Sequence, residues 1–237
     1  LNILKEQIKD NHILILGYGR EGHSTLHRIL EVGGFASVTV ADKNQVQLPD
    51  SVKALCGKHY MDTLDDYDLI FKSPGVVLPK DPEQYSCRFT SQMEVFFEAY
   101  RDRIIGITGT KGKSTTTTLL YHILKKSGQD TVLAGNIGIP AFDILEEIHP
   151  DTRLVCELSC HQLEYTHVSP HIGVLLNIHE EHLDHYGTME KYIHSKQQIY
   201  LHQKPQDLLF CGTDVIPAAG TCRSRIYSVS DQNFWNQ

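Results

Sequence analysis

Residues 104–126 read as a strand, a glycine-rich loop and a helix, and this succession restricts the fold more than any other stretch of the chain. Three isoleucines near its start favour a strand, and the run from Thr115 to Lys126 is compatible with a helix. The glycines between them allow backbone N–H groups to face an anion. The chain is therefore expected to be an α/β protein with a phosphate-binding loop.

The loop carries two side chains that suit a nucleotide. Lys113 can reach the β- and γ-phosphates, and the Ser114 hydroxyl can bind Mg²⁺. The strict spacing G-x-x-x-x-G-K-[ST] is not met, because Ile107 stands where the first glycine belongs. The alternative is a glycine-rich turn that binds nothing. The order of strand, loop, lysine, hydroxyl and helix favours the phosphate loop.

A second glycine-rich turn, G-x-G-x-x-G at residues 17–22, separates the apolar run 12–16 from a helix expected to reach about residue 32. A strand at 37–41 follows and ends at Asp42. This βαβ unit, with an acid after its second strand, predicts a site for a nucleotide diphosphate. A purely structural turn in a Rossmann-like sheet is the alternative.

Another strand, expected at 69–72, ends at the tripeptide Ser73-Pro74-Gly75. Open α/β sheets place ligand loops at such strand ends, but an ordinary turn explains the same residues.

A polar connector covers residues 79–90, and we expect a domain boundary near residue 92. Further apolar runs predict strands at 131–134, 154–158, 172–178 and 207–211, and helices at 141–148 and 189–201. Strands that alternate with helices predict a mainly parallel sheet. We therefore expect a Rossmann-like domain over residues 1–92, followed by a P-loop-type, mainly parallel α/β domain over residues 93–237.

The composition argues against several classes of protein. A net charge of −7 with scattered basic residues gives no attraction to nucleic acid or to an anionic membrane. No apolar run reaches the roughly 18–20 residues of a bilayer span, and the first residues contain no signal-peptide h-region. Six separated cysteines without a CxxC pair indicate a reduced, cytoplasmic protein, in which Cys156 and Cys211 are expected to be buried.

Two further candidates for chemistry follow predicted strands. Glu157 closes an apolar strand, where it either binds Mg²⁺ or faces solvent. The segment HEEHLDH at 179–185 packs three histidines and three acids together. It is compatible with a zinc site, with part of a magnesium site, or with a solvated loop. Lys196 stands on the helix after this segment, and its local sequence alone favours a surface position.

Four motifs, GITGTKGKSTTTT, AGNIG, ELSCHQLE and NIHEEHLDHYGTMEKYIHSK, occur in an order and spacing that resemble the Mur ligases, in particular their glutamate-adding branch. The resemblance covers nearly the whole chain and implies an ATP-dependent amide ligase of peptidoglycan synthesis. In such ligases the alanyl carboxylate of UDP-N-acetylmuramoyl-L-alanine attacks the γ-phosphate of ATP. The amine of glutamate, D-glutamate by default, then attacks the acyl phosphate.

The resemblance also assigns roles to individual residues. It implies catalytic roles for Lys113, His182 and Lys196. Lys196 would be carbamylated by CO₂ and would become an anion. The implied ATP-binding residues are Gly109, Thr110, Lys111, Gly112, Lys113, Ser114 and Thr115, and the implied Mg²⁺ ligands are Ser114, Glu157, His182 and Lys196. The implied substrate-binding residues are Gly17, Gly19, Arg20, Glu21, Asp42, Lys43, Ser73, Pro74, Gly75, Asn136, Ser159 and Gln162.

The chain departs from the family pattern in a few places. Arg20-Glu21 occupies positions in the first loop that are often apolar or Thr, Cys160-His161 stands where Ser-Phe is usual, and Glu181 replaces a common Asp. The family also carries a third, C-terminal domain for the incoming amino acid, and the chain ends before it. We expect the 237 residues to bind the UDP-substrate as a monomer without turnover.

Two other functions are alternatives to the ligase. Folylpolyglutamate synthetases share the ATP domain, but their loop usually reads G-K-G-S and no UDP domain precedes it. A non-catalytic module that binds NAD through the first βαβ unit would leave the phosphate loop, Glu157 and His182 unexplained.

Overall fold

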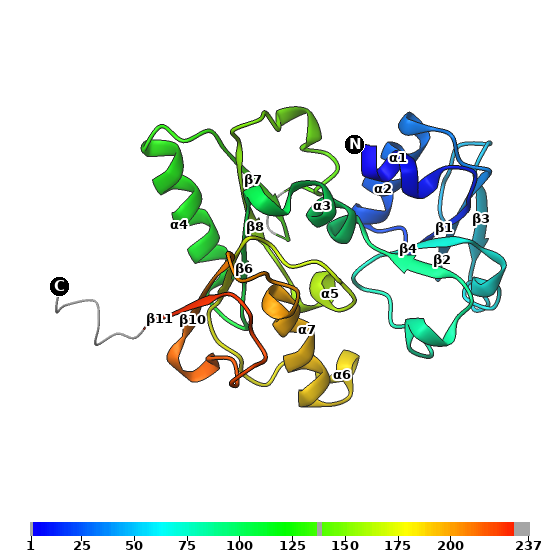
Figure 1. The fold of residues 1–237 in the computed structure, drawn as a ribbon. Coiled ribbons are helices and arrows are strands. Elements are labelled where there is room, and N and C mark those ends of the chain that lie inside the picture. Colours follow the sequence, from blue (N-terminus) through cyan, green and yellow to red (C-terminus); the bar gives the residue numbers. More distant parts are fainter. Residues whose placement is uncertain (1, 137–138, 230–237) are drawn as a thin grey trace. The chain divides into compact units, whose positions relative to one another are not determined.

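The computed structural model describes residues 2–136 and 139–229 (Figure 1). The contacts divide the chain into two compact units, and the division falls between Ala99 and Tyr100. The boundary that we expected near residue 92 would fall at the start of helix α3 (Gln92–Tyr100), whereas the contacts assign nearly all of that helix to the first unit.

The first unit is built on a parallel sheet of five strands within the described residues, in the order β3-β2-β1-β4-β5. Its strands are β1 (His12–Leu16), β2 (Ser37–Asp42), β3 (Lys53–Cys56), β4 (Leu69–Lys72) and β5 (Arg88–Thr90), and its helices are α1 (Asn2–Ile8), α2 (Arg20–Val32) and α3.

Strand β1 lies at the centre of this sheet because its apolar run suits burial on both faces. Its residues from Ile13 to Leu16 are all 0% exposed, as expected for a central strand of a parallel sheet. The strand order reverses between β1 and β4, and open α/β sheets bind ligands at the carboxyl ends of the strands beside such a reversal. Both predicted ligand loops, at 17–22 and 73–75, leave this edge.

The second unit holds a six-stranded parallel sheet within the described residues, in the order β11-β10-β9-β6-β8-β7. Helix α4 contacts β6, β7 and β8, helix α7 contacts β6 and β9, and Figure 1 shows the two helices on opposite faces of the sheet. The strands are β6 (Ile104–Thr108), β7 (Thr131–Gly135), β8 (Arg153–Glu157), β9 (Ile172–Leu175), β10 (Leu208–Gly212) and β11 (Arg225–Val229), and the helices are α4 (Lys113–Lys126), α5 (Cys160–Leu163), α6 (Leu183–Tyr186) and α7 (Met189–Leu201).

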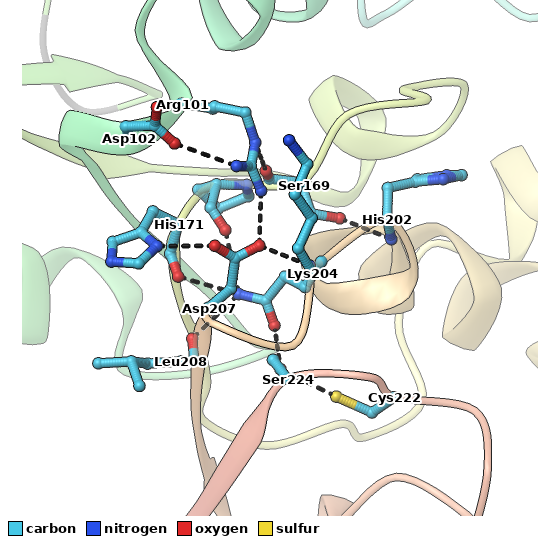
Figure 2. A network of polar contacts seen from close by, with 12 residues as sticks. Arg101, Asp102, Ser169, His171, His202, Lys204, Asp207, Leu208, Cys222 and Ser224 are labelled. Carbon is cyan, nitrogen blue, oxygen red and sulfur yellow. Dashed lines mark hydrogen bonds and ion pairs between the residues drawn. The ribbon is translucent and has the colours of Figure 1, made fainter.

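A buried ion-pair network ties together the amino ends of the second sheet (Figure 2). The carboxylate of Asp207, 0% exposed, accepts hydrogen bonds from Arg101 Nη2 (2.6 Å), His171 Nδ1 (2.7 Å) and the Lys204 N–H (2.6 Å). Arg101 also donates to the Ser169 carbonyl at 3.3 Å. Burial raises the pKa of Asp207, but the hydrogen bonds from Lys204, His171 and Arg101 outweigh it and hold the pKa below its usual value.

The structure corrects two expected elements of the second unit. Residues 141–148 form turns and a 3₁₀ segment, Leu145–Glu147. The carbonyls of this stretch accept hydrogen bonds from the N–H group three residues later, whereas an α-helix would use the N–H group four residues later. The strand expected at 172–178 ends at Leu175, since the next residues turn away to contact the phosphate loop.

Several short elements were not predicted. Strand β5 lies within the segment expected to be a connector, and β3, β11, α1, α5 and α6 lie in stretches without a clear apolar period. All of them are seven residues or shorter, so they contain too few positions for a periodic signal.

All six cysteines are free, and Cys156 and Cys211 are buried as predicted; burial raises the pKa of Cys156 to about 12. Within the ranges described, no helix combines the length and apolar character that crossing a membrane requires.

Candidate functional site

The loop between β6 and α4 follows a path that requires glycine at two positions. Gly109 has φ 154° and Gly112, the residue before α4, has φ 83°. A Cβ on Gly109 would lie 3.0 Å from Leu176 Cβ and 3.3 Å from Asn177 N. The loop backbone is therefore pressed against the segment that follows β9.

Asn177 holds the loop in place through three hydrogen bonds. Its carbonyl accepts from Thr110 N (3.0 Å), its Oδ1 accepts from Lys111 N (2.8 Å), and its Nδ2 donates to the Lys111 carbonyl (3.1 Å). The N–H groups of Thr110 and Lys111 are thus engaged within the protein. Donors for an anion come instead from residues 112–115, because the first N–H groups of a helix have no partner within it.

The Thr110 hydroxyl is engaged within the protein as well. It is buried, accepts from the His179 N–H at 2.9 Å and shares a hydrogen bond of 2.9 Å with the hydroxyl of Tyr192. Tyr192, on α7, is 0% exposed, and its ring lies 4.9 Å from Lys196 Nζ. Thr110 therefore links the loop to α7, while Ser114 and Thr115 remain exposed at the start of α4.

Two lysines meet at one carbonyl of the loop. Lys113 Nζ donates to the carbonyls of Gly109 (3.0 Å) and Thr110 (3.1 Å), and Lys196 Nζ donates to the same Gly109 carbonyl at 2.9 Å. Lys196 is 1% exposed, so the surface position favoured by its local sequence is wrong. Burial, and in addition the nearby Lys113 charge, lower the pKa of Lys196 to about 8.

Glu157 ends β8 in a buried position, and the solvent-facing alternative for it is wrong. It is 1% exposed, and its Oε1 accepts from Asn136 Nδ2 at 2.9 Å. Its Oε2 is buried without a hydrogen-bond partner among the described residues. An ionised carboxylate in this state is costly unless a cation pairs with it. The oxygen therefore fits a hard metal ion such as Mg²⁺.

His182 stands at a strained position beside the same edge of the sheet. Its backbone is left-handed (φ 57°, ψ 29°), which is uncommon for a residue other than glycine and is often found at functional sites. Its carbonyl accepts from the N–H groups of His185 (3.0 Å) and Tyr186 (3.1 Å), which starts α6. Its imidazole is 42% exposed.

The structure does not support three histidines as zinc ligands. Within residues 2–136 and 139–229, no group of three or more His, Cys, Asp or Glu side chains is placed to share an ion. His185 Nε2 is instead 3.2 Å from a carboxylate oxygen of Glu164. The four magnesium ligands that the family resemblance implies are not a group of this kind, because two of them are a serine and a lysine.

The predicted substrate residues of the second unit lie at the ends of β7 and β8. Ser159 and Gln162 form a capping box on α5: Ser159 Oγ accepts from Gln162 N at 3.2 Å, and Gln162 Oε1 accepts from Ser159 N at 3.1 Å. Asn136 donates to Glu157. The next two residues of the AGNIG motif, 137 and 138, lie outside the described residues.

In the first unit the two predicted ligand loops pack against each other. Gly17 has φ 90°, and a Cβ there would lie 2.9 Å from Ser73 Cβ. A Cβ on Gly22 would lie 2.2 Å from the Gly17 carbonyl oxygen, which also accepts a bond of 2.7 Å from Ser73 Oγ. Gly19 has open space around its Cα, since a Cβ there would meet nothing within 4 Å. Pro74 and Gly75 follow Ser73 at this edge.

The carboxylate of Asp42 accepts hydrogen bonds from backbone N–H groups at this edge. Its Oδ2 accepts from Tyr18 N at 2.7 Å and its Oδ1 from Asn44 N at 2.8 Å. An NAD site would use such an acid to bind the ribose hydroxyls, and here both oxygens already have partners. Arg20 and Glu21 begin α2, and Lys43 is exposed beside Asp42.

Residues 107–231 match the family model of the Mur ligase middle domain. The chain belongs to the Mur ligase family. Two curated relatives, both named UDP-N-acetylmuramoylalanine–D-glutamate ligase, come from Clostridium kluyveri (38% identical over 229 residues) and Acetivibrio thermocellus (35% over 227 residues). The matches cover 89% and 90% of this chain and 48% of each relative, so the chain spans about half the length of these Mur ligases.

A solved structure shares the fold. The UDP-N-acetylmuramate:L-alanyl-gamma-D-glutamyl-meso-diaminopimelate ligase from Neisseria meningitides superimposes with a TM-score of 0.53 at 16% identity, over 92% of this chain and 77% of that one. The predicted fold class, mainly parallel α/β, is confirmed, as is the resemblance to the Mur ligases.

Two side chains that shape this candidate site were not singled out from the sequence. Asn177 carried a usable signal, because an asparagine directly after a strand often turns the backbone. Tyr192 carried none, since only the fold brings α7 under the phosphate loop.

A cavity of about 520 Å³ lies at the opposite, amino edge of the first sheet, where His12, Ser37 and Lys53 begin their strands. None of the predicted site residues lines it.

Proposed function

We propose that this chain forms the UDP-substrate-binding and ATP-binding parts of a cytoplasmic ligase that joins D-glutamate to UDP-N-acetylmuramoyl-L-alanine. The relatives that are 35–38% identical to the chain carry that name. The observation that carries the proposal is the buried Oε2 of Glu157, which has no hydrogen-bond partner in the part of the chain that the structure describes. Glu157 pairs in register with Ile107, on the strand that leads into the phosphate loop.

In this proposal the alanyl carboxylate attacks the γ-phosphorus of ATP, the bond to the bridging oxygen breaks and ADP leaves. The glutamate amine then attacks the acyl phosphate, and inorganic phosphate leaves with the former carboxylate oxygen. The N–H groups of residues 112–115 bind the phosphates at the start of α4, with the loop residues Gly109, Thr110 and Lys111 shaping the turn. Lys113 exchanges its loop carbonyls for the oxygens of the transferring phosphoryl group.

Ser114, Glu157, His182 and a carbamylated Lys196 would hold Mg²⁺, which neutralises charge on the phosphates when it is bound. Carbamylation requires the neutral amine of Lys196, which attacks CO₂ and loses a proton. A pKa of about 8 leaves part of this amine uncharged near neutral pH. The carbamate is an oxygen anion, and Lys113 beside it supplies a compensating charge.

The first unit would hold the UDP group where its strand order reverses. The α2 N-terminus with Gly17, Gly19, Arg20 and Glu21 would face the diphosphate. Asp42, Lys43 and the Ser73-Pro74-Gly75 turn would lie beside uridine. Asn136, Ser159 and Gln162 would contact the muramoyl-alanine part. We propose that the protein is monomeric and that neither nucleic acid nor a membrane takes part.

Calorimetric titration of the 237-residue chain with UDP-N-acetylmuramoyl-L-alanine tests this function, with NADH as the control ligand. We expect saturable binding of the UDP compound alone. Gly19→Glu places a negative charge in the loop without a clash and is expected to abolish binding. Asn2→Glu adds the same charge on α1 and is expected to leave binding unchanged. Binding of NADH alone would overturn the proposal in favour of a redox module.

A further inference from the structure

His161 lies in a cluster of rings next to the proposed magnesium ligand His182. Its ring meets that of His182 edge to face, with centroids 4.9 Å apart and an interplanar angle of 73°. It meets His185 in the same way at 4.4 Å and 87°, and it lies nearly parallel to Tyr186 at 5.6 Å. Three neighbours from the 182–186 turn therefore surround one ring of α5.

Within the described residues, few other contacts orient the imidazole of His182. It is 42% exposed, so the core does not enclose it. Its Nε2 lies 3.7 Å from a carboxylate oxygen of Glu181, and this contact between two partly exposed groups contributes little. The ring of Tyr192 is farther away, at 6.1 Å. Of these two rings, which the described residues place against His182, that of His161 is the nearer.

The position of His161 is itself well defined. It belongs to α5, whose first turn is fixed by the capping box of Ser159 and Gln162 and which begins three residues after Glu157. Glu164, at the end of the same turn, binds His185 at 3.2 Å. The segment from Ser159 to Glu164 therefore contacts the 182–186 turn through both His161 and Glu164 and connects it to the end of β8.

We propose that His161 is a positioning residue, whose ring holds the imidazole of His182 in the orientation needed at the metal site. Edge-to-face contacts between aromatic rings are favourable beyond the area that they bury, so this contact favours one rotamer of the exposed His182 side chain. The contact requires a ring and no particular charge on it. This inference rests on the proposed function only through the role given to His182.

The test compares His161→Leu, which removes the ring, with His161→Phe, which keeps it. In the metal-free 237-residue chain, the ¹³C-labelled Cε1–Hε1 signal of His182 reports whether its ring has one orientation or several. We expect a shifted, averaged signal in His161→Leu and a near wild-type signal in His161→Phe. Mn²⁺ affinity, measured by electron paramagnetic resonance, is expected to fall about tenfold in His161→Leu and less than twofold in His161→Phe.

His167→Leu is the matched control, since it makes the same change at an exposed histidine whose ring faces His202. It is expected to leave the His182 signal and the Mn²⁺ affinity unchanged. If His161→Leu does not fold, His161→Gln replaces it with the same expectation. An unchanged His182 signal in the ring-free variant would overturn the positioning role. Failure of the wild-type chain to bind Mn²⁺ would count against the proposed metal site and leave the signal comparison decisive for His161.

Discussion

The second sheet contains two buried carboxylates that differ in how they are satisfied. Asp207, at the amino edge, is 0% exposed and accepts from an arginine, a histidine and a backbone N–H. Glu157, at the carboxyl edge, is 1% exposed, accepts from one amide and keeps one oxygen without a partner among the residues described. The same burial therefore serves stability at one edge and leaves a place for a cation at the other.

From this comparison, Asp207→Asn is expected to cause the largest loss in the free energy of unfolding. The substitution leaves Arg101, whose side chain is 14% exposed, without its buried counter-charge. Breaking a buried pair in this way costs about 3–5 kcal/mol in the free energy of unfolding. Urea unfolding followed by circular dichroism measures the difference, and a loss below about 1 kcal/mol would show that the network does not stabilise the sheet.

Glu157→Gln is expected to act in the opposite way. It removes the charge of a buried carboxylate that has no cation partner among the described residues, so the free energy of unfolding without metal should stay unchanged or rise by about 1 kcal/mol. Affinity for Mn²⁺ should fall at least about tenfold, because a proposed ligand loses its charge. Urea unfolding and metal titration measure the two quantities. A fall in stability as large as that of Asp207→Asn would contradict the prediction that the carboxylate at the carboxyl edge does not stabilise the fold.

The pH dependence of stability sharpens the contrast. The folded pKa of Asp207 lies below its unfolded value of about 3.9, so its contribution is fully present above that pH and is lost as the pH falls through the folded pKa. The stability difference between wild type and Asp207→Asn should therefore shrink as the pH falls from about 5 towards 2. Unfolding free energies at several pH values provide the check, and a constant difference would contradict it.

The smallest effect is expected for Asp102→Asn, which also serves as the matched control for Asp207→Asn. Asp102 binds the same arginine at 3.0 Å, but its side chain is 82% exposed. Exposed pairs of this kind contribute about 0–1 kcal/mol and weaken with salt. The same urea experiment at low and high salt should show little change. A loss of stability comparable to that of Asp207→Asn would mean that the difference in burial does not explain the different contributions of the two acids.

Much of the fold could be predicted because its long elements carry periodic or apolar signals. Strands β1, β6 and β8 are continuous apolar runs, and α2 and α7 are long enough to show as helices. The strands β3 and β11 have only four and five residues, and β11 is exposed along its whole length, so neither carries the signal of a buried strand. Residues 141–148 were misassigned because Pro140 and Pro150 bound a stretch too short to decide between a helix and turns.

Site residues could be predicted only where the order of residues along the chain indicates their chemistry. Lys113 and Ser114 follow glycines in a fixed order, and Glu157 ends an apolar strand. Lys196 has polar neighbours along its helix, so only the fold or a family resemblance could assign it. The contacts of His161 and Tyr192 depend on how α5 and α7 pack, and no spacing along the chain encodes them.

The bonds from Asn177 to the phosphate loop have a consequence for how fast and how tightly a nucleotide can bind. A loop that must become ordered around its ligand loses about 1–2 kcal/mol of backbone entropy for each residue it fixes. Here residues 110 and 111 are already clamped by the protein's own hydrogen bonds. That loss occurs once, during folding, so a triphosphate that binds as proposed would meet a preorganised loop.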